Sequence, residues 1–531
     1  MENPQWKTPA STQGEEFEMI AKTFQGLETV LATELIDLGA NNIQIGRRMV
    51  SFTGDKRLLY RANFSLRTAL RILMPIKHFR ATSADEVYTA IQELDWTNFL
   101  TNDTTFAVDS VVNSQEFRHS KFVAYKVKDA IVDQMRQRTG SRPNIRVTNP
   151  DLQLHIHIAE YDCTLSLDTS GESLHRRGYR QETVEAPLNE VLAAGIIMLT
   201  GWKGECDLID PMCGSGTIPV EAALIARGIA PGVYRKEYAF EKWPDFDQDL
   251  FDSIYEDDSQ EHDFPHHIYG YDINRNAVAI ATTNVKAAGL SKEITIAQQD
   301  FTDFQQPAEK AIIITNPPYG ERISAPDLLG LYKMIGSKFK HCFTGNDAWV
   351  LSYREECFDQ IGLKPSLRTP LYNGSLECEL RKYQMFDGKF SEMRAEGGDI
   401  KTAQERRLMA DRKRFKQHRE FKERLEDDPS EPLGRHSQRF TRKQDREDYR
   451  RDSKRGDFRK ESRGDRKEFH SDRKEFRGDR KEFRGDRKEF RGDARKDFRG
   501  DRKDFRKPFD KPYDRNKTGK KYGKKRYDDE D

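Results

Sequence analysis

Cysteine is scarce in this chain of 531 residues, and so are long apolar stretches. Its six cysteines include no Cys-x-x-Cys pair, so the sequence favours neither a disulfide framework nor a zinc ribbon. No stretch approaches the roughly 18–20 apolar residues of a membrane span. The N-terminus, MENPQWKTPAST, lacks the basic-then-apolar layout of a secretory signal. We therefore expect a cytoplasmic protein without a membrane segment.

Aliphatic residues are almost missing from the C-terminal part. Beyond Leu433 there is no Val, Ile, Leu, Met, Cys or Trp, and variants of GDRKEFR recur instead. Residues 391–531 hold 49 Lys and Arg against 35 Asp and Glu, whereas residues 1–390 hold 41 against 54. Such a basic segment cannot bury enough surface to offset its ordering entropy, which predicts a disordered tail. The tail suits RNA binding through Arg and Phe, with a self-neutralised spacer as the alternative.

Residues 16–170 alternate strand-like and helix-like stretches, typical of an α+β fold. LQLHIHIA (152–159) alternates strictly and could pair with CTLSLD (163–168) as a hairpin. A helix over 120–138 shows a basic outer face that includes Lys121 and Lys128, candidates for RNA contact. His155 and His157 share one strand face, but no third ligand lies nearby. A plain strand face is therefore favoured there, and no metal is predicted.

Residues 186–386 have a different rhythm, in which short apolar strands alternate with helices. The expected strands are 206–210, 268–272, 294–298, 311–315 and 348–352, and helices are expected over 189–199, 217–227, 274–288 and 328–343. This alternation predicts an α/β fold with a mostly parallel, doubly wound sheet. Ligands in such sheets bind beyond the carboxyl ends of the strands.

The first motif at a strand end is DPMCGSGT, from Asp210 to Thr217. Glycines at a strand-to-helix turn allow a ligand to approach the backbone, and an acidic residue there can hold polar ligand groups. The motif is neither a P-loop nor a dinucleotide GxGxxG. Cys213 is a poor candidate nucleophile because no His lies in the motif to activate it. A turn used only for packing is the alternative.

Two further acidic residues follow neighbouring strands. Asp272, in YDIN, suits a ribose diol, whose two hydroxyl protons a carboxylate accepts. Asp300, in QDF, could bind an adenine amino group, with Phe301 covering the ring. Each residue alone could be a helix cap. Together with Asp210 they predict one ligand pocket.

The fourth motif, NPPYGERI, ends the strand 311–315. Pro317 and Pro318 fix two φ angles and remove two backbone donors, which leaves the Asn316 side-chain oxygen and the Pro317 carbonyl as acceptors. These acceptors suit an exocyclic amino group, and the Tyr319 ring can stack on a base taken out of its stack. A bare turn is the alternative.

In this order and on these strands, the four motifs resemble class I S-adenosylmethionine-dependent methyltransferases that act on exocyclic amines. SLHRRGYR (173–180) and EAPLNEVLAAGI (185–196) sharpen the resemblance to the bacterial 23S rRNA guanine-N2 methyltransferases with an N-terminal THUMP domain. Some members continue into a second methyltransferase domain, where this sequence has its basic repeat tail. The resemblance implies a ferredoxin-like segment (16–60), a THUMP RNA-binding domain (61–168), a linker (169–185) and a Rossmann-like methyltransferase domain (186–386).

The resemblance also implies roles for single residues. Asn316, Pro317, Pro318 and Tyr319 would orient the guanine amine. S-adenosylmethionine would be held by Asp210, Cys213, Gly214, Ser215, Gly216, Thr217, Asp272, Asp300, Phe301 and Asn189. The substrate would be 23S rRNA or a large-subunit precursor.

The segment 173–180 places Arg176, Arg177 and Arg180 between the two halves, where Arg suits phosphate and base contacts. A solvated linker is the alternative for this segment. For the whole chain, three other functions stay open: guanine-N2 methylation of tRNA, adenine-N6 methylation of DNA, and non-catalytic RNA binding. The THUMP-like half argues against DNA, and the intact motifs argue against a vestigial domain.

Overall fold

A computed structural model describes residues 14–185, 187–307, 310–320 and 325–386. All of them belong to one compact unit of the chain. The tail predicted to be disordered, 391–531, lies outside the described residues. Within the described residues, no helix is long and apolar enough to cross a membrane. The same residues contain no cluster of three His, Cys, Asp or Glu side chains that could hold a metal ion.

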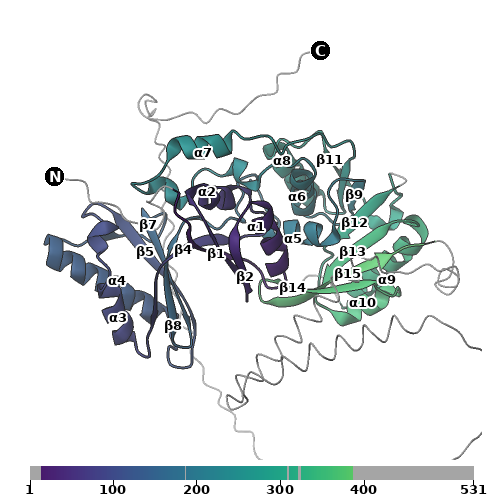
Figure 1. Cartoon of the computed structure of the whole chain (residues 1–531). Helices are drawn as coiled ribbons and strands as arrows, with labels where there is room; N and C mark the ends of the chain where they lie inside the picture. The colour runs from purple at the N-terminus through teal and green to yellow at the C-terminus, as the bar shows by residue number, and fades with distance from the viewer. Residues whose placement is uncertain (1–13, 186, 308–309, 321–324, 387–531) are drawn as a thin grey trace, which may run out of the picture. The chain divides into compact units, whose positions relative to one another are not determined.

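The first half of the chain builds an eight-stranded sheet in the order β2-β3-β1-β4-β8-β7-β5-β6 (Figure 1). Its strands are β1 (Phe17–Lys22), β2 (Asn41–Gly46), β3 (Met49–Gly54), β4 (Arg71–Arg80), β5 (Thr105–Asn113), β6 (Asn144–Ile145), β7 (Leu152–Ala159) and β8 (Asp162–Asp168). The predicted hairpin is confirmed, because β7 pairs antiparallel with β8. The boundary predicted at residues 60/61 falls within a helix, and strands on both sides of it share this sheet.

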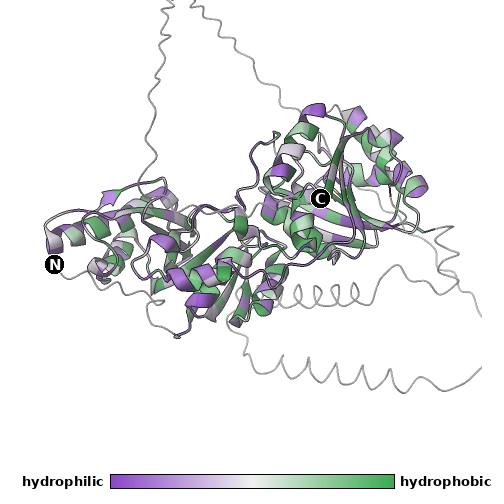
Figure 2. Ribbon diagram, turned by 90° about the horizontal axis from the view of Figure 1, so that it is seen from above, coloured by the Kyte–Doolittle hydropathy of each residue, from purple (hydrophilic) through white to green (hydrophobic). Residues whose placement is uncertain are grey.

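Four helices cover one face of this sheet: α1 (Glu28–Asp37), α2 (Lys56–Ser65), α3 (Ala84–Gln92) and α4 (Ser120–Thr139). Side chains of alternate strand residues join them in one hydrophobic cluster, which includes Met19, Phe52, Met74 and Leu154 from strands and Leu31, Leu59, Ile91 and Ile131 from helices. Hydrophobic residues accordingly concentrate on the strands and the inward sides of the helices (Figure 2). Ser83 begins α3 by accepting the backbone N–H of Glu86, as its position before an amphipathic run predicts.

The second half builds a seven-stranded sheet in the order β11-β10-β9-β12-β13-β15-β14. Its strands are β9 (Asp207–Asp210), β10 (Ile268–Asp272), β11 (Ile294–Gln298), β12 (Ala311–Thr315), β13 (Asp347–Ser352), β14 (Leu367–Asn373) and β15 (Leu376–Gln384). The first five strands in this order, β11, β10, β9, β12 and β13, are parallel, and β15 pairs antiparallel with β13. The predicted doubly wound, mostly parallel sheet is thus confirmed, with β14 and β15 as an unpredicted antiparallel edge.

Helices cover both faces of the second sheet because its strands are apolar on both sides. Leu208 packs into a cluster with α5 (Glu190–Thr200), α6 (Thr217–Ala226) and α8 (Arg275–Ala287). Ile209 packs into the opposite cluster with α9 (Ala325–Cys342) and α10 (Glu355–Ile361). The loops at the carboxyl ends of these strands carry the motifs of the candidate site.

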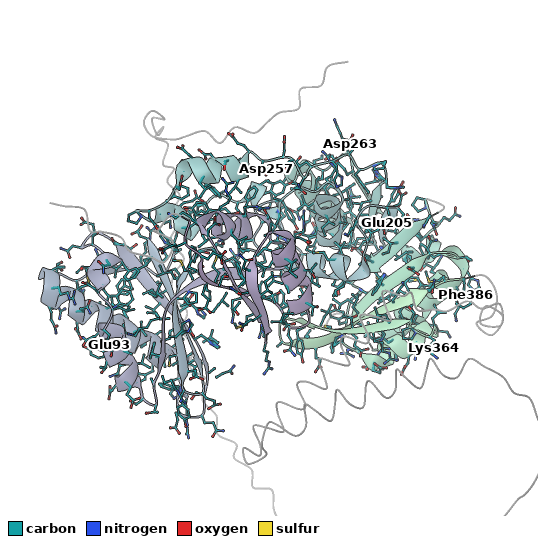
Figure 3. All side chains as sticks on the ribbon, in the orientation of Figure 1. Glu93, Glu205, Asp257, Asp263, Lys364 and Phe386 are labelled. Atoms are coloured by element: carbon teal, nitrogen blue, oxygen red, sulfur yellow. The ribbon has the colours of Figure 1, made fainter. Side chains whose placement is uncertain are left out.

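The segment between α6 and β10, which the sequence left as an irregular acidic stretch, packs against the first half. It contains short 3-10 turns at Pro231–Tyr234 and Ala239–Lys242, followed by α7 (Gln248–Tyr255). The ring of Phe240 in this segment stacks on the ring of Tyr60 in α2, with the ring centroids 4.4 Å apart. After α7 the chain passes the exposed residues Asp257 and Asp263 on its way to β10 (Figure 3). The remaining 3-10 turns are Trp96–Asn98 and Phe301–Asp303.

Candidate active site

Four polar residues come directly after, or within two residues of, the ends of neighbouring parallel strands. The sheet order places Asp300 (after β11), Asp272 (β10), Asp210 (β9) and Asn316 (after β12) side by side. Strand register supports this, because Gly270 pairs with Asp210 and Asp272 pairs with Gln298. The structure therefore brings together, at one edge of the sheet, the four positions that the sequence singled out.

The glycine-rich loop between β9 and α6 depends on two glycines with positive φ. Gly214 has φ +54°, and a Cβ atom built there would meet only Val184, at 3.9 Å. Gly216 has φ +80° and begins α6, where a Cβ atom would lie 3.2 Å from the Cβ of Ala281. The space over Gly214 is thus open, whereas Gly216 permits close packing of the loop on α8.

Asp210 is buried beneath this loop. One of its oxygens accepts the backbone N–H of Met212 at 3.2 Å. Burial raises the pKa of Asp210 to about 8, the charge of Asp272 adds to this shift, and the Met212 N–H and the Thr315 hydroxyl oppose it. A carboxyl in this environment ionises readily only when a positive charge arrives beside it.

Asp272 is half-buried and holds the loop in place. One oxygen accepts the backbone N–H of Gly214 at 3.0 Å, and the other accepts that of Asn274 at 2.8 Å. Cys213 is buried beside these carboxylates, and burial together with Asp210 and Asp272 raises the pKa of its thiol. A thiol in this environment stays protonated, so the structure gives Cys213 no nucleophilic role.

Asp300 and Phe301 are neighbours in sequence but differ in their exposure to solvent. Asp300 is exposed and accepts the backbone N–H of Thr302 at 2.8 Å, and the hydrogen bonds from Thr302 lower the pKa of Asp300. Phe301 is buried, with its ring 5.6 Å from that of Phe304 and 6.1 Å from that of Phe343. The carboxylate is therefore open to a ligand, whereas the ring belongs mainly to the core.

The Asn-Pro-Pro-Tyr motif leaves β12 at the next position along the edge. Asn316 is half-buried, Pro317 is buried and Pro318 is exposed. The Tyr319 hydroxyl donates a hydrogen bond to the Asn316 side-chain oxygen. Burial raises the pKa of Tyr319, which keeps this hydroxyl protonated as a donor. Its ring meets that of Tyr353 edge-on, with centroids 5.4 Å apart.

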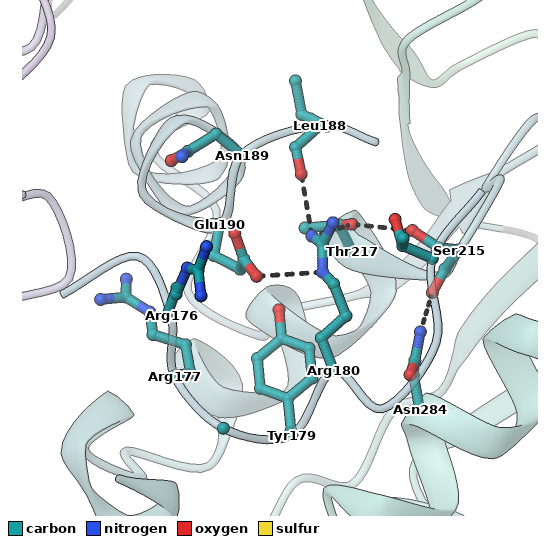
Figure 4. Close-up of polar contacts among 12 residues, drawn as sticks. Arg176, Arg177, Tyr179, Arg180, Leu188, Asn189, Glu190, Ser215, Thr217 and Asn284 are labelled. Atoms are coloured by element: carbon teal, nitrogen blue, oxygen red, sulfur yellow. Dashed lines mark hydrogen bonds and ion pairs between the residues drawn. The ribbon is translucent and has the colours of Figure 1, made fainter. Parts of the chain in front are cut away.

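The arginines predicted to bind RNA from the segment 173–180 lie in different surroundings. Arg177 is 2% exposed and lies against Glu221 (3.4 Å), with a further bond to the Leu174 carbonyl. Arg180 pairs with Glu190 at 3.0 Å and also donates to Thr217 (Figure 4). Both guanidinium groups thus have partners within the protein, and both residues also line a cleft of about 1130 Å³, so their contact with RNA stays a prediction. The alternative of a solvated linker does not describe Arg177, which is buried.

Arg176 and the α4 lysines stay accessible. Arg176 is exposed and pairs with Glu172, four residues earlier, at 2.7 Å. Lys121 is exposed, and Lys128 lies over the ring of Tyr125, 4.8 Å from its centroid. Tyr125 itself is 56% exposed, an aromatic neighbour that the sequence argument did not include.

Asn189 begins α5, where its side-chain oxygen accepts the backbone N–H groups of Val191 (3.0 Å) and Leu192 (3.4 Å). It also lines a cleft of about 1130 Å³ whose wall includes Thr183, Pro187 and Arg176. Its capping bonds explain why an asparagine stands there. Its predicted place in a cofactor pocket stays a prediction.

Sequence reasoning missed two residues of the site. Asn284 of α8 donates to the carbonyl of Ser215 (3.0 Å) and accepts the backbone N–H of Gln181 (2.9 Å), which ties the glycine-rich loop to the segment before α5 (Figure 4). Thr315 is buried beside Asp210, and its hydroxyl opposes the rise in the pKa of that carboxyl. Asparagine within an amphipathic helix carries no local signal, but Thr315 directly precedes Asn316 and its position could have been noticed.

Comparisons with known proteins agree with this arrangement. Residues 177–382 match the model of an RMKL-like methyltransferase domain, residues 81–168 match a THUMP domain, and residues 18–73 match the RlmL ferredoxin-like domain. A putative RNA methyltransferase of Synechocystis sp. is 38% identical over 369 residues, which cover 69% of this chain and 96% of that protein.

Two further proteins are similar over the same region. The ribosomal RNA large subunit methyltransferase K/L of Syntrophotalea carbinolica is 39% identical over 381 residues, 69% of this chain. The match covers 53% of that enzyme, so the chain spans about half of its length. The crystal structure of SMU.472, a putative methyltransferase complexed with SAH, is 29% identical with a TM-score of 0.64, covering 71% of this chain and 100% of that one.

Proposed function

Because the chain belongs to the family of RMKL-like methyltransferases, we propose that it transfers a methyl group from S-adenosylmethionine to the N2 amine of a guanine in 23S rRNA. The observation that carries this proposal is the position of Asn316. Its strand, β12, adjoins β9 in the sheet, and β9 ends in Asp210 beside the glycine-rich loop. An amine acceptor and a loop that suits a nucleoside ligand thus occupy neighbouring strand ends.

The residues at this edge fit S-adenosylmethionine. The space over Gly214 leaves room for a ligand against the backbone, and Asp272 and Asp300 keep carboxylate oxygens near it. In the proposed site Asp210 and the loop 213–217 hold the methionine part, Asp272 the ribose and Asp300 the adenine. When bound, the cofactor supplies a methyl group made electrophilic by its sulfonium.

The Asn-Pro-Pro-Tyr motif supports an amine as the acceptor. The Asn316 oxygen has two lone pairs, so it can accept a substrate N–H as well as the Tyr319 hydroxyl. Pro317 cannot donate a backbone hydrogen bond, and its carbonyl offers a second acceptor. An amine held by both acceptors has its lone pair directed out of the ring plane toward the methyl group. It loses its proton after the attack, so the rate comes mainly from positioning.

Two features support RNA as the substrate. The relatives from Synechocystis sp. and Syntrophotalea carbinolica are named as RNA methyltransferases, and residues 81–168 match a THUMP domain. The surface of α4 offers Lys121 and Lys128 beside the exposed ring of Tyr125, a combination that binds phosphate and stacks on bases. Exposed Arg176 adds a third cation at the cleft wall. The proposed partner is 23S rRNA, free or in a large-subunit precursor.

The test is methyl transfer by the purified full chain. Cofactor labelled at the methyl group is offered with a 23S rRNA transcript, with tRNA and with duplex DNA, and the modified nucleoside is identified by mass spectrometry. We expect N2-methylguanosine in the rRNA alone. Methylated adenine in duplex DNA, or N2-methylguanosine in tRNA alone, would contradict the proposal.

The variant Asn316→Ala tests the assigned role. It should lower the transfer rate by about a hundredfold or more, the loss expected when a group that aligns the reacting atom is removed. Cofactor affinity should change less than about twofold, because Asn316 is assigned to the amine. Asn102→Ala, an exposed asparagine far along the chain from the four motifs, is the matched control and should leave both quantities unchanged. Equal losses of transfer and cofactor binding would refute the role.

A further inference from the structure

The eight-stranded sheet has a second face that none of α1 to α4 covers. Strand register identifies its residues, because Lys22 of β1 lies directly opposite Arg71 of β4, and His155 of β7 lies opposite Ser166 of β8. Alternation of side chains places these residues opposite the hydrophobic cluster with the helices. Figure 1 shows α3 and α4 together on one side of β7 and β8. We call the other side the polar face, defined by Lys22, Arg71, His155, His157 and the adjoining turn residue Arg48.

The charge balance of the polar face is positive around its centre. The pKa of His155 is lowered to about 3, first by burial and then by the positive charges of Lys22 and Arg71. Burial lowers the pKa of Lys22 too, and the charge of Arg48 adds to this shift. Lys22 and Arg48 therefore repel one another here, a cost that an anionic ligand would reduce.

The carboxylates of this face are already engaged or lie at its margin. Asp168 pairs with Arg71, and Glu18 pairs with His78 at 2.9 Å. Glu28 accepts the backbone N–H groups of Gly26 and Arg48. Asp109 is exposed on β5; burial lowers the pKa of Arg71, and the charge of Asp109 opposes this shift. Within the described residues, Lys22 and Arg48 thus make no ion pair.

The polar face continues into the cleft of about 1130 Å³. Arg71 and Gln153 line both, and the cleft extends along Arg176 and exposed Lys236 to Asn189. Asn189 begins α5, and the segment just before it is bonded through Asn284 to the glycine-rich loop. A chain of phosphates laid on the polar face would therefore have a path toward the candidate active site.

We infer that the polar face binds the phosphodiester backbone of the substrate RNA, with Lys22 and Arg48 contacting phosphate. The inference rests on the proposed function for the identity of the RNA. The strands carry no Phe, Tyr or Trp on this face in the part of the chain that the structure describes, and the His155 ring is buried, unlike the exposed rings of sheets that stack bases. The polar face therefore adds affinity and orientation, and it does not select the modified nucleotide.

The test compares two double variants with equal charge change in the full chain. Lys22→Gln with Arg48→Gln removes both cations of the polar face. Lys286→Gln with Lys292→Gln removes two exposed cations at the end of α8 and in the turn before β11, which lies at the amino ends of the parallel strands. Binding of a 23S rRNA transcript, and of an oligouridine of about 20 nucleotides, is measured by fluorescence polarisation over a range of salt concentrations.

The polar-face variant should bind both RNAs roughly tenfold more weakly at about 0.1 M salt. Its slope of log K against log salt should be shallower by about 1.4, two contacts at roughly 0.7 each. The α8 control should match the wild type. An unchanged slope in the polar-face variant would overturn the inference, and so would tighter RNA binding, which would mean that acidic residues of this chain occupy the face.

The proposed function fails separately. Wild-type chain that transfers no methyl group to RNA would refute the function, whatever the binding results. If the wild type is active, the polar-face variant should modify the same nucleotide at saturating RNA. A change in the modified position would contradict the assignment to backbone contact alone.

Discussion

Asp210 offers a prediction that needs no substrate, because its environment couples folding to pH. The side chain is 1% exposed at the end of β9, and burial raises its pKa to about 8. At pH 7 about nine-tenths of the folded molecules would then hold a proton on this carboxyl. The variant Asp210→Asn keeps the size of the side chain and removes the titration.

The sign of the effect follows from the two pKa values. An unfolded chain releases this proton near pH 3.8, whereas the folded chain retains it to about pH 8. Asp210 therefore contributes most to the free energy of unfolding below about pH 4, and this contribution is lost as the pH rises to about 8. The full loss is about 6 kcal/mol, from about 1.4 kcal/mol for each pH unit between 3.8 and about 8. The Asp210→Asn variant has no carboxyl to titrate, so its free energy of unfolding should not decline in this way. It should therefore be the more stable protein at pH 8 without cofactor.

The measurement is urea unfolding between pH 4 and pH 9 for the wild type, Asp210→Asn and Asp300→Asn. Asp300 is exposed, and the Thr302 bonds lower its pKa, so any stability that it gives is present at neutral pH and lost toward acid. Asp300→Asn should thus keep the wild-type decline from pH 4 to pH 8. Identical declines in the wild type and Asp210→Asn would refute the reasoning.

Cofactor binding should release the proton that Asp210 carries. A cation placed beside Asp210 favours the ionised carboxylate, so binding of S-adenosylmethionine below pH 8 should release a proton. Calorimetry in two buffers of different ionisation enthalpy measures that release, which should approach one proton near pH 6 and disappear in Asp210→Asn.

Two further predictions concern the buried contacts of the first and second halves. Arg177→Ala leaves buried Glu221 with the Tyr179 hydroxyl but without its ion-pair partner and should cost about 3–5 kcal/mol of stability, whereas Arg176→Ala at an exposed ion pair should cost at most about 1 kcal/mol; similar urea midpoints for the two variants would contradict the buried pairing. Phe240→Ala removes the ring that stacks on Tyr60 and should cost about 3–5 kcal/mol in the same assay; a loss below about 1 kcal/mol would show that this segment does not pack as the structure has it.

The strand ends were predictable because local patterns determine them. Each of Asp210, Asp272 and Asn316 ends or directly follows a short apolar run, and parallel strands must present their carboxyl ends at one edge. The helix predicted over 120–138 is present as Ser120–Thr139 for a similar reason, since its apolar residues repeat with helical period. Periodicity and motif order therefore sufficed for the sheet and for the positions of its polar ends.

The fates of Arg177 and Arg180 could not be predicted in this way. Nothing near either residue in the sequence distinguishes it from exposed Arg176. The partner of Arg177 is Glu221, 44 residues later, and Arg180 reaches Thr217 of the glycine-rich motif itself. A cation becomes structural when the fold supplies a buried acceptor, and that acceptor is known only once α6 has been placed.

The segment 228–256 shows packing across a predicted domain boundary that the sequence pattern does not reveal. Its sequence position assigns it to the methyltransferase half, yet Phe240 and Phe251 belong to the hydrophobic cluster of the first sheet. Arg67, in the loop after α2, donates hydrogen bonds to the carbonyls of Leu224 and Ile229 in the second half. Each half thus supplies side chains to the other, and neither satisfies its own buried groups alone. The glycine-rich loop, which Asn284 ties to the segment before α5, therefore belongs to a network of contacts that the two halves share.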